Sequence, residues 1–189
     1  MQSEVKNMKL MIASDIHDSA KYCDLMLQKF HMHEADKLLI LGDILYHGPR
    51  NPLPEDYAPK KVFEMLNPEK KNIMAVQGNC DAHIDNVVLE FPIVPDYILM
   101  EINGLTIYAT HGHIFNEKNP LPLHNNEIML NGHFHTPAFS QYEDWLYMNP
   151  GSVSMPKDGT PHSYIIMEGK TFKWYNLLND EVFGEVTIM

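Results

Sequence analysis

Seven side chains that could bind divalent metal ions lie in five short polar segments of the chain. The seven are Asp15, His17, Asp43, Asn79, His111, His133 and His135. Carboxylates, imidazoles and an amide carbonyl are suitable ligands for Mn²⁺, Fe²⁺, Zn²⁺, Co²⁺ and Ni²⁺, and the set contains no thiolate. Two ions about 3.5–4 Å apart need a ligand that reaches both, which a carboxylate can do and an imidazole cannot. We therefore expect a two-metal centre bridged by Asp43 or Asp15, and favour Asp43 because it stands alone on its turn.

A glycine stands beside a candidate ligand at four places in the sequence. These glycines are Gly42, Gly78, Gly112 and Gly132. Glycine suits a backbone that must turn sharply or come close to the ions. Each ligand taken singly has an ordinary explanation, since an aspartate after a strand is usually a turn or cap residue. Their joint occurrence in one short chain predicts the metal site.

The five polar segments each follow an apolar run that predicts a strand. Residues 10–13, 37–41 and 73–76 are such runs, and apolar residues at helical spacing separate them. This order predicts βαβ units. Strands side by side in a sheet place their carboxyl ends along one edge, so we expect the candidate ligands to converge there.

The second half of the chain is expected to be antiparallel. Asn103-Gly104 lies between apolar runs at 97–102 and 105–110, which predicts a tight hairpin. The run at 105–110 leads into His111, and the run at 127–130 leads into His133. Short strands are expected from residue 145 onward, and the proline-rich segment 47–59 predicts a long loop.

Length, composition and charge restrict the class of protein. The 189 residues, 44% of them apolar, predict one globular domain over residues 1–189. The net charge of −11 counts against a nucleic-acid partner. Cys23 and Cys80 lack the spacing of a thiolate zinc site, and no disulfide is expected. The polar residues 1–9 lack the apolar stretch of a secretory signal, and no run of about 20 apolar residues could span a bilayer. We expect a cytoplasmic protein without a membrane partner.

The candidate ligands stand in five motifs. They are D-x-H at 15–17, G-D at 42–43, G-N-C-D at 78–81, H-G-H at 111–113 and G-H-x-H at 132–135. Together the motifs resemble the calcineurin-like metallophosphoesterases. The segments 47–51, 57–59 and 149–154 resemble in particular the bacterial YfcE phosphodiesterases, and the similarity runs from Met8 nearly to the end of the chain.

That resemblance implies the fold and the division of the ligands. The fold would be an α/β four-layer α/β/β/α sandwich, with two facing mixed sheets flanked by helices. One ion would take Asp15, His17, Asp43 and His135, and the other Asp43, Asn79, His111 and His133. Asp43 would bridge the ions, as the reasoning from residue types also favours.

The resemblance also implies the activity. The protein would be a metal-dependent phosphodiesterase that cleaves small phosphodiesters by attack of a hydroxide held by the two-metal centre. Asp43, Asn79 and His111 would be its catalytic residues. The ions would be two per chain, with Mn²⁺ expected first and Fe, Zn, Co or Ni as alternatives.

Two positions depart from the family pattern. Many members carry a histidine directly after the metal-binding asparagine, where this chain has Cys80, a poor proton donor. Esters with good leaving groups, such as aryl alcohols, would then be favoured, unless Cys80 is only a small residue packed beneath the site. Asp18 replaces a usual glycine and either caps a helix or adds negative charge near the ions.

Four further residues are candidates for contact with substrate. His47, Arg50, Cys80 and His113 lie beside candidate ligands in sequence, so each could touch a bound phosphate or support a ligand. Arg50 suits a bidentate contact with phosphate. A loop arginine is also commonly just solvated.

Two other functions remain as alternatives. A relative with this fold acts as a trafficking scaffold with an altered metal site, and Cys80 would suit such a binding module. The seven filled ligand positions favour hydrolysis instead. A phosphomonoesterase or nuclease could use the same ions, although the acidic balance counts against nucleic acid. The 13 methionines fit either a core or self-association, so a homo-oligomer is left open.

Overall fold

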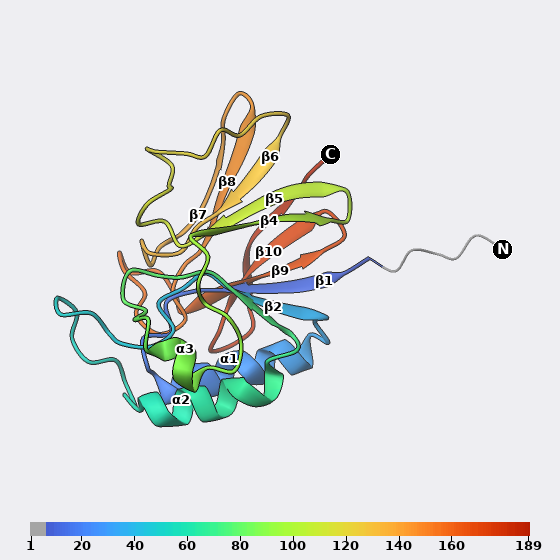
Figure 1. The fold of residues 1–189 in the computed structure, drawn as a ribbon. Coiled ribbons are helices and arrows are strands. Elements are labelled where there is room, and N and C mark those ends of the chain that lie inside the picture. Colours follow the sequence, from blue (N-terminus) through green and yellow to red (C-terminus); the bar gives the residue numbers. More distant parts are fainter. Residues whose placement is uncertain (1–6) are drawn as a thin grey trace.

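The computed structural model describes residues 7–189, which form two β-sheets that face each other, with α-helices beside one of them (Figure 1). Most of the polar segment 1–9, for which no secretory signal is expected, lies outside the described residues. Among the described helices, none has both the length and the apolar character that crossing a bilayer requires.

The first sheet is built around the predicted βαβ units. Its central strands β1 (Lys9–Ala13), β2 (Lys37–Ile40) and β3 (Ile73–Ala75) pair in parallel, with Met11 opposite Leu38 and Leu38 opposite Ile73. Helices α1 (Ala20–Met32) and α2 (Pro59–Leu66) connect them, followed by a short 3₁₀ turn, η1 (Asn67–Glu69), and by α3 (Asp85–Val88) after β3. Antiparallel strands β9 (Ser163–Glu168), β10 (Thr171–Asn176) and β11 (Val182–Thr187) complete the order β11-β10-β9-β1-β2-β3.

The second sheet has the order β4-β5-β6-β8-β7 and is mixed. The predicted hairpin is present as β4 (Tyr97–Ile102) and β5 (Leu105–Thr110), with positive φ at both Asn103 and Gly104 as a tight hairpin turn requires. However, β5, β6 (Glu127–Leu130) and β8 (Trp145–Pro150) pair in parallel, and antiparallel pairing is confined to the two edge strands, β4 and β7 (Pro137–Gln141). The expectation of an antiparallel second half was therefore wrong for these central strands, because long connections rather than tight turns join them.

Successive side chains of β1 point to opposite faces of the first sheet, and each face has its own apolar core. Met11 packs with Cys23, Met26 and other residues of α1 on the helical side of the sheet. Its neighbours Leu10 and Ile12 face the other way and pack with residues of the second sheet such as Ile107 and Met148. The central strands are therefore apolar on both faces, which is why they read as continuous buried runs in the sequence.

The predicted fold class is confirmed, and the described α-helices lie beside the first sheet only. The described α-helices all precede Leu89 and lie together beside the first sheet (Figure 1). On the second sheet, Tyr97 and Leu99 of β4 are 45% and 53% exposed, so its outer face is open to solvent among residues 7–189. The segments after residue 89 are short strands and turns, which is why they add no helical layer there.

Candidate metal centre

The seven candidate ligands come from the carboxyl ends of strands in both sheets. Asp15 and His17 follow β1, Asp43 follows β2 and Asn79 follows β3, while His111 follows β5, and His133 and His135 follow β6. Only 3.4 Å separates Asp43 Oδ2 from Nε2 of His111, although the two residues belong to different sheets. The expectation of a single sheet edge was too simple, because the site forms where the strand ends of two facing sheets meet.

Five of these residues adopt backbone conformations that side chains rarely take. Asp15, His17, Asp43, His133 and His135 have φ angles of 59°, 48°, 52°, 66° and 62°. Left-handed backbone at non-glycine residues costs free energy and persists only where surrounding contacts impose it. Five of the fourteen non-glycine residues with positive φ between residues 7 and 189 are thus candidate ligands, while others, such as Glu34 and Asn125, lie in turns away from strand ends that carry ligands.

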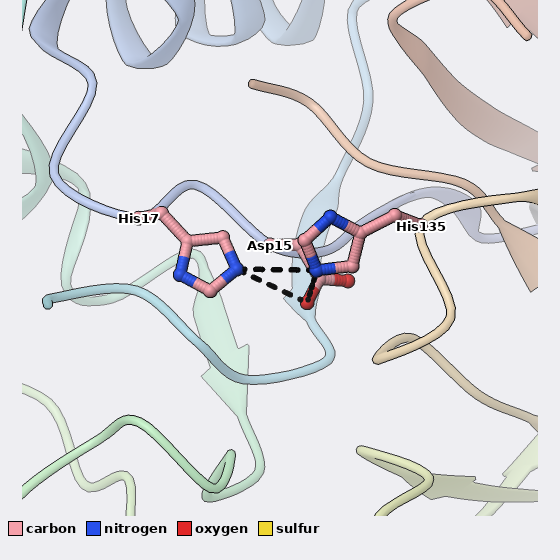
Figure 2. A group of neighbouring side chains, drawn as sticks. All are labelled: Asp15, His17 and His135. Atoms are coloured by element: carbon pink, nitrogen blue, oxygen red, sulfur yellow. Dashed lines mark hydrogen bonds and ion pairs between the residues drawn. The ribbon is translucent and has the colours of Figure 1, made fainter. Parts of the chain in front are cut away.

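The buried half of the centre consists of Asp15, His17 and His135 (Figure 2). Nε2 of His17 lies 3.3 Å from Nε2 of His135, and these atoms lie 3.6 Å and 3.2 Å from Asp15 Oδ1. All three residues are 0–2% exposed. Burial raises the pKa of Asp15, but the neighbouring His135 and His17 outweigh it and hold that pKa well below its usual range.

The outer ring nitrogens of these histidines decide where the protons lie. Nδ1 of His17 donates to the carbonyl oxygen of Tyr46 at 2.9 Å, and Nδ1 of His135 donates to that of Met155 at 2.7 Å. A carbonyl can only accept, so in the neutral rings both Nε2 lone pairs point at each other and at Asp15 Oδ1. Three converging acceptors need a cation between them, and the set therefore fits a divalent ion.

The second half of the centre gathers around His111. Its Nδ1 donates to Leu41 O at 2.6 Å, and its Nε2 lies 3.1 Å from Asn79 Oδ1 and 3.2 Å from His133 Nδ1. Burial disfavours the charged ring, but the carboxylate of Asp43 outweighs burial and raises the pKa of His111 to about 9. Burial and the nearby His111 lower the pKa of His133 to about 4. This half, too, attracts positive charge and offers converging lone pairs.

Asp43 lies between the two halves. Its Oδ2 is 3.7 Å from His17 Nε2 and 3.4 Å from His111 Nε2, while its Oδ1 accepts the backbone N–H of Cys80 at 2.8 Å. A Cβ at Gly78 would stand 2.1 Å from Asp43 Oδ1, so no side chain fits there. The close approach predicted for the glycines beside candidate ligands is thus present at Gly78.

Asp81 is a functional residue that the sequence reasoning missed. Its buried carboxylate accepts backbone N–H groups from the segment around Asp43, namely Asp43 at 2.8 Å, Ile44 at 2.7 Å and Leu45 at 3.3 Å, and also that of Gly78 at 2.7 Å. Burial and the charge of Asp43 raise its pKa to about 6. Asp81 therefore fastens the two turns that carry Asp43 and Asn79. Asp81 is the last residue of the G-N-C-D motif, and this position in the sequence could have pointed to it.

A cavity of about 330 Å³ opens onto the centre. It is lined by candidate ligands, including Asn79 and His133, and by three residues that could meet a substrate, Arg50, Cys80 and Lys157. Lys157 was not predicted. It is placed by its backbone N–H, which donates to the carbonyl of the candidate ligand His135 at 3.1 Å.

The other two substrate candidates do not line this cavity. The ring of His47 contacts the rings of Tyr46 and Tyr57, at centroid distances of 4.9 Å and 5.3 Å. His113 is exposed, and its ring centroid lies 5.4 Å from that of His111. His113 therefore lies beside a candidate ligand, whereas His47 packs among tyrosine rings, and neither residue is part of the cavity wall.

The two departures from the family motifs have definite positions. Cys80 is half-buried at the cavity wall, where burial and Asp43 raise the pKa of its thiol, so it stays protonated at neutral pH. Asp18 does not cap the helix, because the side chain of Ser19 accepts the N–H of Tyr22 in that role. Instead, the buried Asp18 Oδ2 accepts the N–H of Tyr46 at 2.6 Å. Since His17 bonds the carbonyl of the same Tyr46, the pair fixes the start of the loop after β2.

Comparisons with known proteins agree with this geometry. The family described as calcineurin-like phosphoesterase superfamily domain matches residues 8–171. Phosphodiesterase YfcE of Escherichia coli (strain K12) is 41% identical over 181 residues, which covers 96% of this chain and 98% of the relative. A solved structure of Yfce, a phosphoesterase from E. coli, covers 96% of this chain and 100% of its own, with a TM-score of 0.93. Zinc-complexed Vps29 from Entamoeba histolytica covers 95% and 99% with a TM-score of 0.64 at 18% identity, a likeness of fold alone.

Proposed function

The chain belongs to the calcineurin-like phosphoesterase superfamily, and from this premise we propose that it is a metal-dependent phosphodiesterase acting on small phosphodiesters at a two-metal centre bridged by Asp43. One ion would take Asp15, His17, Asp43 and His135. The other would take Asp43, Asn79, His111 and His133. We further propose Mn²⁺ as the working ion, because the oxygen and imidazole ligands suit it, with Fe, Zn, Co and Ni as substitutes.

The observation that carries the proposal is the position of Asp43. A single oxygen, Oδ2, faces Nε2 of His17 in the buried half and Nε2 of His111 in the second half, within 3.7 Å of each. In the buried half, the Nε2 lone pairs of neutral His17 and His135 meet Asp15 Oδ1 without a proton donor, and in the second half Nε2 of neutral His111 faces the acceptor Asn79 Oδ1. A carboxylate shared between two such groups is the arrangement that two neighbouring ions require.

The chain's own residues would divide the remaining work. When bound, the ions would lower the pKa of a coordinated water and neutralise charge on the phosphoryl oxygens. Arg50 and Lys157, at the cavity wall, would add positive charge beside the phosphate in a protein whose net charge is −11. The thiol of Cys80 would donate a proton poorly, so aryl esters should be cleaved faster than alkyl esters.

The competing functions have weaker support. All seven ligand positions are filled by ligand types, which favours hydrolysis over a purely scaffolding role. The net charge of −11 disfavours a long nucleic-acid substrate. We therefore propose a small diester as the substrate, a cytoplasmic location and no membrane partner, and a homo-oligomer stays open.

A substrate panel with defined metals tests the proposal. Protein stripped by a chelator is reloaded with each ion and assayed on a bis-aryl phosphate, an alkyl aryl phosphate, an aryl monophosphate and a dinucleotide. We expect Mn²⁺ to restore cleavage of the bis-aryl diester. Asp43→Asn should lower its kcat/KM by about 10³-fold or more, since the shared negative oxygen is lost from both ions.

Asp24→Asn provides the matched control, because it makes the same chemical change on the exposed face of α1. It should keep full activity. Full activity in Asp43→Asn would overturn the assignment of the site. A protein that binds metal but cleaves no diester in the panel would favour the scaffold role instead.

A further inference from the structure

A second cavity adjoins the one over the metal centre. Its volume is about 450 Å³, and it shares Asn51 and Lys157 with the first cavity. Its walls come from two loops that are far apart in sequence, residues 51–55 after β2 and residues 154–157 after β8. The two volumes lie in the range of about 300–1,000 Å³ found for small-molecule sites. An occupant of the first cavity can therefore extend into the second past Asn51 and Lys157.

Most of the wall of the second cavity is apolar. Pro52, Leu53, Met155 and Pro156 contribute to it, and Leu53 is 63% exposed although it is a large apolar residue. Exposed apolar side chains beside a cavity often mark the place where a ligand is covered. The wall therefore suits an uncharged, largely apolar group better than a second phosphate.

His162 supplies a hydrogen-bond acceptor in this wall. Its ring stacks on Tyr22 with centroids 4.0 Å apart, and its Nδ1 lies 2.8 Å from the carbonyl oxygen of Val153. Burial lowers the pKa of His162, so the ring is neutral at pH 7 and its single proton lies on Nδ1. Nε2 then keeps a free lone pair, with no hydrogen bond to any residue between 7 and 189.

The acidic group at the edge of the cavity is already neutralised. Glu55 pairs with Nζ of Lys21 at 2.8 Å and accepts the hydroxyl of Tyr22 at 3.3 Å. The positive charge at the cavity boundary comes from Lys157, on the side that faces the metal centre. Charge is thus placed where a phosphate would lie, and apolar surface with one acceptor where an organic group would lie.

We propose that the second cavity binds one of the two organic groups of the substrate diester, namely an uncharged ring system that carries an N–H or O–H donor, such as a nucleoside. This rests on the proposed phosphodiesterase function. The phosphate lies at the metal centre between Arg50 and Lys157, one organic group passes Asn51 to reach Leu53 and His162, and the other leaves through the open mouth. The cavity makes the enzyme select diesters by this group.

Paired substrates and a matched pair of leucine variants test this selection. The p-nitrophenyl ester of a nucleoside 5′-phosphate carries the proposed group, whereas methyl p-nitrophenyl phosphate lacks it. In Leu53→Asp, a charge enters the apolar wall, and the ratio of kcat/KM for the large diester to that for the small one should fall about tenfold. Leu99→Asp makes the same change at a leucine that is 53% exposed on β4, a strand of the second sheet that contributes no residue to the cavity wall. It should leave the ratio unchanged.

A binding measurement separates this proposal from the proposed function. The free nucleoside is titrated into metal-free protein while the ring protons of His162 are followed by NMR, with the exposed His124 as the internal reference. We expect a saturable shift at His162 only. Diester hydrolysis with an unchanged ratio in Leu53→Asp and no His162 shift would overturn the second site. A His162 shift in a protein that cleaves no diester would overturn the proposed function instead, and with it the role of the cavity as a substrate site.

Discussion

The two halves of the candidate metal centre differ most in their exposure to solvent. Asp15 and His17 are fully buried. Asp15 Oδ2 accepts the backbone N–H of His133, and Nδ1 of His17 donates to the backbone carbonyl of Tyr46. Asn79 is exposed and His133 is half-buried at the mouth of the cavity. Closed metal sites serve structure, whereas sites with open positions serve catalysis. On the proposed two-metal centre, the buried half would therefore hold its ion as part of the fold, and the open half would be the one that meets substrate.

The pKa values of the histidines also differ between the two halves. Burial opposes charge on His17, but Asp15 and Asp43 outweigh it and raise the pKa of His17. At His133, burial and His111 act together and lower the pKa to about 4. Both halves therefore attract positive charge, the buried half at His17 and the open half at His111, but only the open half also has a neutral imidazole, His133, ready as a ligand at neutral pH.

The largest contrast should appear when one histidine is removed from each half. His17→Ala leaves the buried Asp15 carboxylate without its partner and opens a cavity, which should lower the free energy of unfolding by about 3–5 kcal/mol. His133→Ala removes a half-exposed side chain and should cost less than about 1 kcal/mol. Denaturant titrations of the Mn²⁺-loaded proteins measure both values. Equal losses would remove the distinction between the halves.

A pH series on the metal-free protein should show the positive charge that the open half holds at His111. The pKa of His111 is raised from 6.5 to about 9, so its contribution is fully present below pH 6.5 and is lost as the pH rises through 9. This amounts to about 3 kcal/mol of unfolding free energy. In the metal-loaded protein the ions replace the proton, and stability should change little across that range. A metal-free protein that is equally stable at pH 6.5 and 9.5 would contradict this.

Asp81 allows the turns that carry Asp43 and Asn79 to be loosened without replacing a candidate ligand. In Asp81→Asn, an amide replaces one oxygen that accepts two backbone N–H groups, so the turns carrying Asp43 and Asn79 lose support. Buried donors left without acceptors should cost about 2 kcal/mol. The exposed Asp144→Asn should cost less than about 0.5 kcal/mol. Calorimetry on both variants measures the difference in unfolding free energy. Similar losses would show that Asp81 does not stabilise the two turns.

The smallest effect concerns the missing proton donor in the open half. Cys80→His places an imidazole at the cavity wall, and it should raise kcat for an alkyl diester by about tenfold or more. An aryl diester, whose leaving group needs little protonation, should gain less. Cys80→Ala controls for the loss of the thiol and should bring no gain. Equal gains for both esters would mean that the new residue acts by something other than proton donation.

The parts of the fold that were predicted correctly are those determined by residues close together in sequence. The hairpin at Asn103-Gly104 has the predicted bounds because its turn residues act on their own neighbours. β7 (Pro137–Gln141) was missed, because it begins with a proline and lacks apolar alternation, as an edge strand can. The parallel pairing of β5, β6 and β8 joins segments that long connections separate, and no local pattern specifies it.

The site was predicted through residue types rather than through contacts. Carboxylates and imidazoles after strand ends were visible in the sequence, so the seven candidate ligands could be proposed from it, and the structure brings their side chains together. Lys157 was missed because it lies 22 residues beyond His135 and reaches the cavity only through a tertiary contact. His47 and His113 were chosen for being near ligands in sequence, yet neither lines the cavity, because adjacent residues in a turn point to different sides.

Anomalous diffraction from crystals of the Mn²⁺-loaded protein tests the shared role of Asp43 most directly. We expect two manganese peaks about 3.5–4 Å apart, one on each side of Asp43 Oδ2, with Asp15 beside the first and Asn79 beside the second. A single peak, or two peaks of which only one contacts Asp43, would contradict a centre bridged by this residue.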